Sequence, residues 1–269
     1  MVEIRDISQI IGEYNDAYVK LGRNVTAYCP LSLAIYKNER GLTLYRDGSA
    51  FLPRRGDGWF MPLANKEYIQ QFALAHKGEK MVCLTQGDLA LLEREGLRTP
   101  DEDEYVYDRT EQNELQGPKF SKVRAKISRF TREHEVYSVP ITRDNILVAY
   151  EILDKWSPAS GEGDKEGAGA ALDGFFTLGL SGTITYTDGA AVAYLCGGNI
   201  SPDTYMLCSA KQTENYQGLN IKAKYDLYAN LPAEIRLINT ESDHGQAGVR
   251  MHKTDLRPVY KIETYSLVL

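Results

Sequence analysis

The last hundred residues show a clear order of β-patterned and helix-patterned segments, and this order constrains the fold more than any other feature of the chain. Alternating apolar residues bounded by turn signals predict strands, and longer amphipathic stretches predict helices. In chain order these are strands at 181–186, 190–195 and 205–208, a helix at 219–230, a strand at 236–239, a short helix at 247–253 and a strand at 260–269. A three-strand meander followed by a long helix and further strands is typical of an α+β domain.

The first half of the chain has a similar mixture of helices and strands. In chain order its pattern predicts an amphipathic helix from Ile4 to Tyr18, a hairpin across Gly48, a helix at 66–75, a strand at 81–84 and a helix at 86–95. A length of 269 residues can hold two domains of ordinary size. We therefore expect an N-terminal domain at 1–133 and a C-terminal domain at 134–269, the second carrying the active site.

Composition is that of an ordinary globular protein. Hydrophobic residues make up 43% and charged residues 25% of the sequence, which argues against disordered, collagen-like and coiled-coil architectures. No charge-free stretch reaches the length and apolar character of a membrane helix, and residues 1–11 lack the apolar core of a signal peptide. We therefore expect a cytoplasmic protein without a transmembrane segment.

Cysteine and histidine spacing argues against a disulfide framework or a metal site. The four cysteines lie apart in apolar runs with no C-x-x-C pair, so we expect buried, reduced thiols. His244 and His252 are eight residues apart without a ligand spacing, so we expect no bound metal. The formal charge of -6 opposes indiscriminate nucleic-acid binding but leaves room for a local basic site.

The sign of the charge reverses in the middle of the sequence. Seven acidic residues and one arginine occupy 101–114, whereas six basic residues and no acid occupy 119–132. Apolar residues at 120, 123, 127 and 130 recur at helical spacing, which predicts a helix with an apolar stripe beside a basic stripe. Two interpretations stay open: a solvated helix face, or a surface that binds an anionic partner.

A glycine-rich stretch from Ala159 to Gly169 follows a predicted helix. It matches neither G-x-G-x-x-G nor the phosphate loop G-x-x-x-x-G-K-[ST], and both of those motifs need a preceding strand. We interpret it as a flexible connection and not as a nucleotide-binding loop.

An ordered set of short motifs runs through the second half of the chain. It comprises Tyr107-x-Arg109-Thr110-Glu111, Glu114-Leu115-x-Gly117-x-Lys119-Phe120-x-Lys122-x-Arg124, Arg129-Phe130, Leu178-Gly179-Leu180-x-Gly182, Asp188-Gly189-x-x-Val192-Ala193-Tyr194, Ala210-Lys211 and Ile238-Asn239-x-Glu241-x-Asp243-x-Gly245-x-x-Gly248-x-Arg250-x-x-Lys253. From about residue 20 to residue 269 the chain resembles the C-terminal family of phosphatidylglycerol lysyltransferases. It departs from the family pattern at Ser242, His244 and Cys208, while both acids of the last motif are retained.

The resemblance implies a fold and a reaction. The fold would be two tandem domains of the GCN5-related acyltransferase (GNAT) type, each with a mixed central sheet flanked by helices. Family members with known activity move an aminoacyl group from charged tRNA to the glycerol hydroxyl of phosphatidylglycerol, and they normally carry a transmembrane part ahead of this region. Because no such part is expected here, the acceptor could be a lipid or a soluble hydroxyl or amine. The protein would then be cytoplasmic or peripheral to the inner face of the membrane.

Acyl transfer from an ester needs a base, donors for the developing oxyanion, and positive charge where phosphate binds. Combined with the family pattern, this requirement makes Asp243 or Glu241 the group expected to orient or deprotonate the acceptor, and Arg250 with Lys253 the expected phosphate site. Lys211 is a third catalytic candidate. The basic helix is expected to contact the tRNA acceptor stem or an anionic lipid through Lys119, Lys122, Arg124, Lys126 and Arg129.

Two other functions are compatible with the sequence. An acyl-coenzyme A donor would need a loop of the form [QR]-x-x-G-x-[GA] before the long helix. At 215–220 only Gly218 matches, so we expect aminoacyl-tRNA as the donor and no cofactor. A noncatalytic descendant could instead bind tRNA or another anionic ligand without turnover, with residues 241–253 serving only as a polar loop with surface cations.

Overall fold

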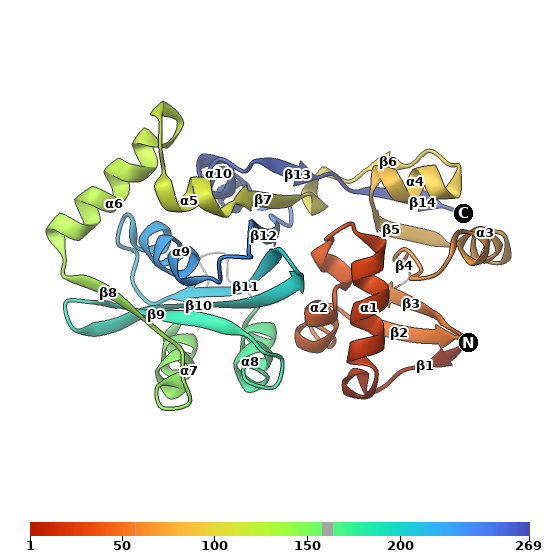
Figure 1. Ribbon diagram of the computed structural model, residues 1–269, viewed down its shortest axis with the longest axis horizontal. Helices are drawn as coiled ribbons and strands as arrows, with labels where there is room; N and C mark the ends of the chain where they lie inside the picture. The colour runs from red at the N-terminus through yellow and green to blue at the C-terminus, as the bar shows by residue number, and fades with distance from the viewer. Residues whose placement is uncertain (57, 158–163) are drawn as a thin grey trace. The chain divides into compact units, whose positions relative to one another are not determined.

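The computed structural model describes residues 1–56, 58–157 and 164–269, which form two compact units (Figure 1). The first unit comprises residues 1–105, 241–250 and 261–269, and the second comprises residues 106–240 and 251–260. Residues 159–163 of the predicted glycine-rich connection lie outside the described residues. The end of that stretch, from Lys165 onward, belongs to a helix.

A mixed sheet of seven strands forms the centre of the first unit. In spatial order the strands are β1 (Val2–Glu3), β2 (Leu42–Asp47), β3 (Ala50–Arg55), β4 (Gly58–Trp59), β5 (Lys80–Leu84), β14 (Tyr265–Val268) and β6 (Leu97–Arg98). Only β4 and β5 are parallel among these neighbours. The predicted hairpin is confirmed, because β2 and β3 pair up to Asp47 opposite Ala50, with Gly48 at positive φ in the turn.

Local capping signals explain where the helices of the first unit begin. In chain order these helices are α1 (Ile11–Leu21), α2 (Pro30–Ile35), α3 (Lys66–Ala75) and α4 (Gln86–Leu92). The Asn65 side chain accepts a hydrogen bond from the Tyr68 N–H at 2.9 Å, and Thr85 and Asp88 form a reciprocal capping box at α4. The first helix begins later than predicted, because Asp6 caps a separate short turn before Ile11.

A second mixed sheet of seven strands forms the centre of the second unit. In spatial order the strands are β13 (Tyr260–Ile262), β7 (Glu104–Asp108), β12 (Leu237–Ser242), β11 (Thr204–Gln212), β10 (Ala190–Ser201), β9 (Ser181–Thr187) and β8 (Val136–Pro140). The pairs β8–β9, β9–β10 and β10–β11 are antiparallel, whereas β11 and β12 run parallel. The predicted three-strand meander is confirmed as β9, β10 and β11.

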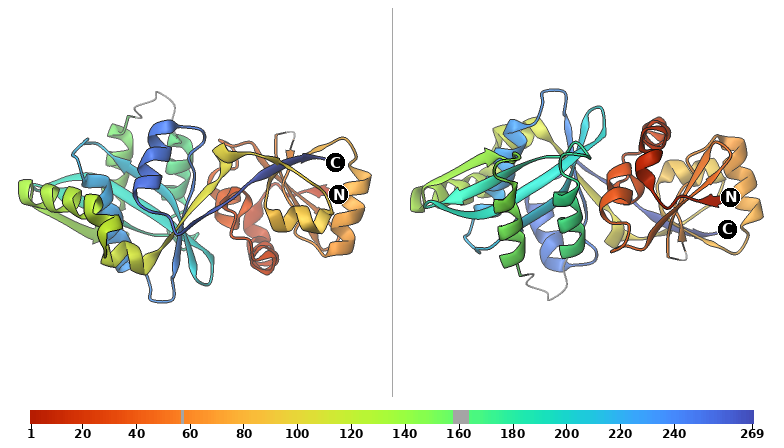
Figure 2. Two further views of the ribbon diagram at one scale, coloured as in Figure 1. Left: turned by 90° about the horizontal axis from the view of Figure 1, so that it is seen from above. Right: turned by 90° about the horizontal axis from the view of Figure 1, so that it is seen from below.

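Helices cover both faces of the second sheet. In chain order the helices after β7 are α5 (Arg109–Glu114), α6 (Ser121–Glu133), α7 (Ile146–Lys155), α8 (Lys165–Asp173), α9 (Leu219–Asn230) and α10 (Ala247–Asp255). α7 and α8 lie side by side on one face and α9 lies on the opposite face (Figures 1 and 2). α6 packs against α9, with Phe130 and Leu219 in one buried cluster. The predicted basic helix and the predicted long helix are both confirmed.

The two units divide the chain at positions other than the expected boundary between residues 133 and 134. Strand pairing is the reason, because β7 joins the sheet that contains β12 and β13, and residues 106–133 group with the second unit. The predicted strand at 260–269 is two strands, β13 and β14, which belong to different sheets. β7 has no counterpart among the predicted strands, because its residues lie within the acidic run.

Two further expectations concern the cysteines and membrane-spanning segments. All four cysteines are buried and free, as predicted. Buried thiols of this kind act as small apolar side chains. Within the described ranges, no helix combines the length and the apolar character needed to cross a bilayer.

Candidate functional site

The predicted acidic motif covers the last two residues of β12 and the turn that follows, and we call residues 241–245 the motif loop. Glu241, His244 and Gly245 have positive φ angles of 60°, 49° and 75°. This conformation is unfavourable for residues other than glycine, so surrounding contacts must hold the loop in place.

Asp243 supplies most of those contacts. It is buried, and its carboxylate accepts hydrogen bonds from Arg250 Nε (3.0 Å) and Nη2 (2.9 Å), from the Tyr105 hydroxyl (2.5 Å) and from the Gly245 N–H (2.9 Å). Burial raises the pKa of this carboxyl, but the hydrogen bonds from Arg250, Tyr105 and Gly245 outweigh it and lower the pKa to about 2. Asp243 is therefore a fixed anion that anchors the loop, and it accepts protons poorly near neutral pH.

Two more of the residues predicted in this motif, Arg250 and Glu241, are also paired. Arg250 Nη2 contacts the Asp101 carboxylate at 2.6 Å in addition to Asp243, so two carboxylates already neutralise its guanidinium. Glu241 accepts a hydrogen bond at 2.9 Å from Arg40, whose guanidinium stacks 3.6 Å above the Tyr36 ring. An incoming phosphate would therefore compete with two carboxylates for the Arg250 guanidinium.

Lys253 and Lys211 lie in the second unit and have separate partners. The Lys253 ammonium is buried and donates to the Thr240 carbonyl. The Lys211 ammonium forms an ion pair with Asp164 at 2.5 Å and lies 4.3 Å from the centre of the Trp156 ring. Glu241, Asp243 and Arg250 thus share the first unit, while Lys211 and Lys253 belong to the other. Their catalytic and phosphate-binding roles stay predictions.

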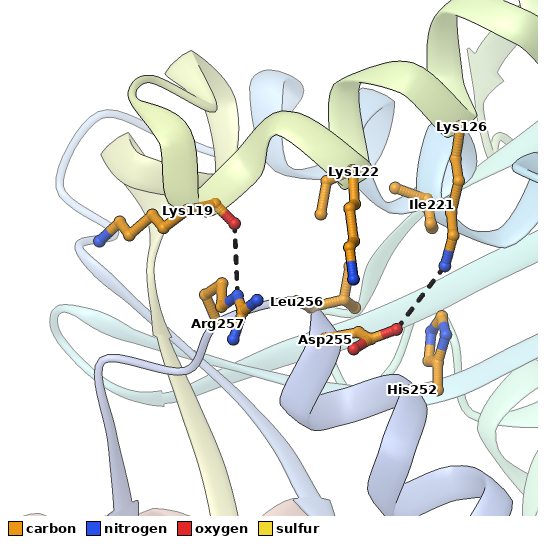
Figure 3. A pocket seen from close by; sticks show the side chains of 9 residues that line it. Lys119, Lys122, Lys126, Ile221, His252, Asp255, Leu256 and Arg257 are labelled. Atoms are coloured by element: carbon orange, nitrogen blue, oxygen red, sulfur yellow. Dashed lines mark hydrogen bonds and ion pairs between the residues drawn. The ribbon is translucent and has the colours of Figure 1, made fainter.

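Part of the basic helix lines a pocket in the second unit, which we call the basic pocket (Figure 3). It is lined by Lys119, Lys122, Val123, Lys126, Ile221, His252, Asp255, Leu256 and Arg257. Four basic side chains there face one carboxylate, that of Asp255, which lies 3.7 Å from the Lys126 ammonium. Such an excess of positive charge suits an anionic ligand.

The lysines of the basic pocket differ in how far they are already paired. The Lys119 ammonium contacts both oxygens of Glu111 at 2.7 Å. Lys122 is exposed and forms no hydrogen bond or ion pair with any of the described residues, and Figure 3 shows its side chain extending toward α10. Lys122 is therefore the cation most available to a phosphate.

The remaining predicted cations of the basic helix point to other partners. Arg124 donates to the Leu115 and Gly117 carbonyls, and Arg129 pairs with Glu133 at 2.8 Å. Arg257, which the sequence analysis missed, joins the pocket because its Nε donates to the Lys119 carbonyl at 3.3 Å. In the sequence, the only indication of this role was that Arg257 is a basic residue shortly after the short helix predicted at 247–253.

A second hollow adjoins the basic pocket, and we call it the apolar pocket. It is lined by Gln112, Leu115, Val123, Ile127, Ile221, Lys224, Tyr225, Tyr228 and Leu256. Val123, Ile221 and Leu256 line both pockets. Lys224 was not predicted as a site residue. The sequence could have indicated that Lys224 is buried, because its spacing with Ile221 and Leu227 places it on the buried stripe of α9.

Comparison with known proteins places this geometry in a family. The sequence matches the family described as phosphatidylglycerol lysyltransferase, C-terminal, over residues 33–268. No curated protein matches it. A solved structure from Bacteroides thetaiotaomicron, a conserved protein of unknown function, is 21% identical, with a TM-score of 0.83 and 99% of each chain covered.

Two more solved structures are similar at lower identity. L-PGS from Bacillus licheniformis is 13% identical, with a TM-score of 0.67 over 99% of this chain and 93% of that one. FemX is 9% identical, with a TM-score of 0.59 over 100% of this chain and 98% of that one. These likenesses concern the fold. Together with the two mixed seven-stranded sheets, they confirm the predicted pair of GNAT-like domains.

Proposed function

The chain belongs to the phosphatidylglycerol lysyltransferase C-terminal family and is an acyltransferase-like protein, and from this premise we propose that it transfers an aminoacyl group from aminoacyl-tRNA to a hydroxyl or amine acceptor. The basic pocket carries this proposal. Its four cations and single carboxylate suit a phosphate of the tRNA end or of an anionic acceptor.

The start of α9 supports aminoacyl-tRNA over acyl-coenzyme A as the donor. Coenzyme A pyrophosphate would need open N–H groups at this helix terminus. The Leu219 N–H already donates to the Tyr216 carbonyl at 3.2 Å. A Cβ placed on Gly218 would lie 2.6 Å from the Lys126 carbonyl oxygen, so the α6 backbone packs closely against this turn. A carbonyl oxygen at that position is unfavourable for a pyrophosphate.

Binding of tRNA tests the role of the basic pocket. We expect the double substitution Lys122→Gln/Lys126→Gln to weaken binding of aminoacyl-tRNA about tenfold or more at low salt. It should also reduce the salt dependence of binding, because fewer counterions are released when fewer phosphate contacts form. The measurement is filter binding at several ionic strengths. Arg132→Gln is a control for charge on the same helix outside the pocket, and its effect on binding should be well below half of the effect of the double substitution.

Equal binding by the pocket variant and the wild type would contradict this role. Transfer itself is measured as movement of a labelled amino acid from tRNA to phosphatidylglycerol in vesicles or to soluble hydroxyl and amine acceptors. Acylation from labelled acyl-coenzyme A instead would contradict the proposed donor.

A noncatalytic tRNA-binding or anion-binding protein is the second candidate function. It is favoured by the pairing of both motif acids, Glu241 with Arg40 and Asp243 with Arg250. This function predicts binding that depends on Lys122 without transfer to any acceptor. The binding and transfer measurements above therefore separate the two candidates.

A further inference from the structure

Lys224 is a buried lysine in a pocket without a carboxylate. Lys224 is only 8% exposed, and none of the residues that line the apolar pocket is acidic. Lysine normally keeps its amine in water, because an unpaired buried charge is costly. A lysine held in this environment lowers stability, and such groups are more common at functional sites than elsewhere.

His252 and Asn220 fix the position of the Lys224 amine. His252 Nε2 lies 3.1 Å from Lys224 Nζ and 3.0 Å from the Asn220 side-chain oxygen. An amide oxygen can only accept a hydrogen bond, so His252 Nε2 carries the proton in this arrangement. A lysine ammonium would place a second donor against that N–H, whereas a neutral amine offers it a lone pair. The contacts therefore fit Lys224 in its neutral form.

The charges around the pair act in the same direction. Burial and the charge of Lys253 lower the pKa of Lys224 to about 7. The charge of a protonated Lys224, burial, and the charges of Lys126 and Lys253 lower the pKa of His252 to about 3. When Lys224 is neutral, burial and the other two charges still lower this pKa, so the His252 ring is neutral. The other titratable groups that line the apolar pocket are Tyr225 and Tyr228, and burial raises the pKa of Tyr228. A substantial fraction of Lys224 is thus a free amine at neutral pH.

Lys224 and His252 lie next to the phosphate site that we propose in the basic pocket. His252 lines the basic pocket and Lys224 lines the apolar pocket, and the two pockets share walls. We infer that Lys224 is the proton acceptor of the transfer reaction and that His252 positions its amine. This assignment rests on the proposed function, and it places the attacking group at the apolar pocket while a phosphate occupies the basic one.

The proton and bond changes balance without a further reactant. The lone pair of the Lys224 amine turns from the His252 N–H to the attacking hydroxyl or amine, and it takes the proton as the attacking atom bonds to the aminoacyl carbonyl carbon. The ester bond between that carbon and the terminal ribose oxygen of the tRNA then breaks. The Lys224 ammonium returns its proton to the ribose oxygen, and the amine is restored.

Three proteins test the assignment: the wild type, Lys224→Met and Lys224→Arg. Single-turnover transfer of a labelled amino acid is followed from pH 5.5 to 9, and tRNA binding is measured in parallel. We expect the wild-type rate to fall below about pH 7, as Lys224 becomes protonated. Lys224→Met should transfer at least about a hundredfold more slowly with unchanged tRNA binding, because it cannot accept a proton. Lys224→Arg should be equally slow, because arginine stays protonated.

Folding of the variants is checked by thermal unfolding. A buried base whose folded pKa lies below its ordinary value destabilises the fold most fully below the folded pKa, and the effect fades as pH rises toward the ordinary value. Lys224→Met should therefore melt higher than the wild type at and below pH 7, with a smaller difference at pH 9. A slow but stable Met variant cannot be explained by unfolding.

The possible results separate this assignment from the proposed function. Transfer by Lys224→Arg at the wild-type rate would show that Lys224 acts as a cation, and rapid transfer by Lys224→Met would remove it from the reaction. Either result overturns the assignment alone. Absence of transfer by the wild type would overturn the proposed function and this assignment with it.

Discussion

At the scale of the single residue, Asp243 holds the motif loop through contacts that the chain makes only when folded. Its folded pKa of about 2 lies below the ordinary value of 3.8, so its stabilising effect is complete above about pH 4 and is lost as pH falls toward 2. We expect Asp243→Asn to lower the free energy of unfolding at pH 7 by about 1–3 kcal/mol, the usual cost of a weakened buried hydrogen-bond set. Urea unfolding of both proteins at pH 7 and pH 2.5 measures this difference in the free energy of unfolding.

The pH dependence distinguishes this effect from a general loss of packing. The difference between the wild type and Asp243→Asn should shrink at pH 2.5, because the Asp243 carboxyl of the unfolded wild type, with its ordinary pKa of 3.8, is then mostly protonated. A difference that stays constant between the two pH values would contradict the anchoring role. Asp144→Asn is a suitable control, because Asp144 is exposed.

At the scale of the element, the packing of α6 on α9 decides whether the basic pocket forms. Gly218 is the N-cap residue of α9 and has a φ of 106°, and its missing side chain leaves room for the Lys126 carbonyl and the Phe130 Cβ. We expect Gly218→Ala to lower stability by at least about 1–2 kcal/mol, because alanine is strained at this φ and its Cβ would collide with α6. The same substitution should weaken tRNA binding, since α6 carries Lys122 and Lys126.

Thermal unfolding and filter binding together measure this prediction. Gly179→Ala is the matched control, because Gly179 also has a positive φ of 64° but has nothing within 4 Å of an added Cβ. It should lose stability without losing tRNA affinity. Unchanged binding by Gly218→Ala would show that the α6–α9 contact does not position the basic pocket.

At the scale of the whole molecule, the C-terminus completes the sheet of the first unit. β14 lies between β5 and β6, and Leu269 exchanges backbone hydrogen bonds with Gly78 and Glu79 at 2.7 and 2.9 Å. We expect removal of residues 265–269 to expose residues 1–105 to limited proteolysis, because an interior strand is lost. Removal of residues 1–4 is the control, because β1 is an exposed edge strand of that sheet. Equal protection after both truncations would contradict the prediction.

The sequence by itself determined the elements and the family, because both depend on patterns within short stretches of chain. The hairpin at Gly48, the meander, the basic helix and α9 all follow from local periodicity and turn residues. The ordered motifs were enough to predict two GNAT-like domains.

Only the tertiary structure decided which charged groups are available. Asp243 and Arg250 neutralise each other and Arg124 donates to backbone carbonyls, whereas Lys122 pairs with none of the residues that the structure describes. The neighbours of Lys224 come from α9 and from α10, where His252 lies 28 residues away in sequence. The physical reason is that burial and pairing set a side chain's charge, and both depend on contacts between segments far apart in the chain, which a local pattern does not encode.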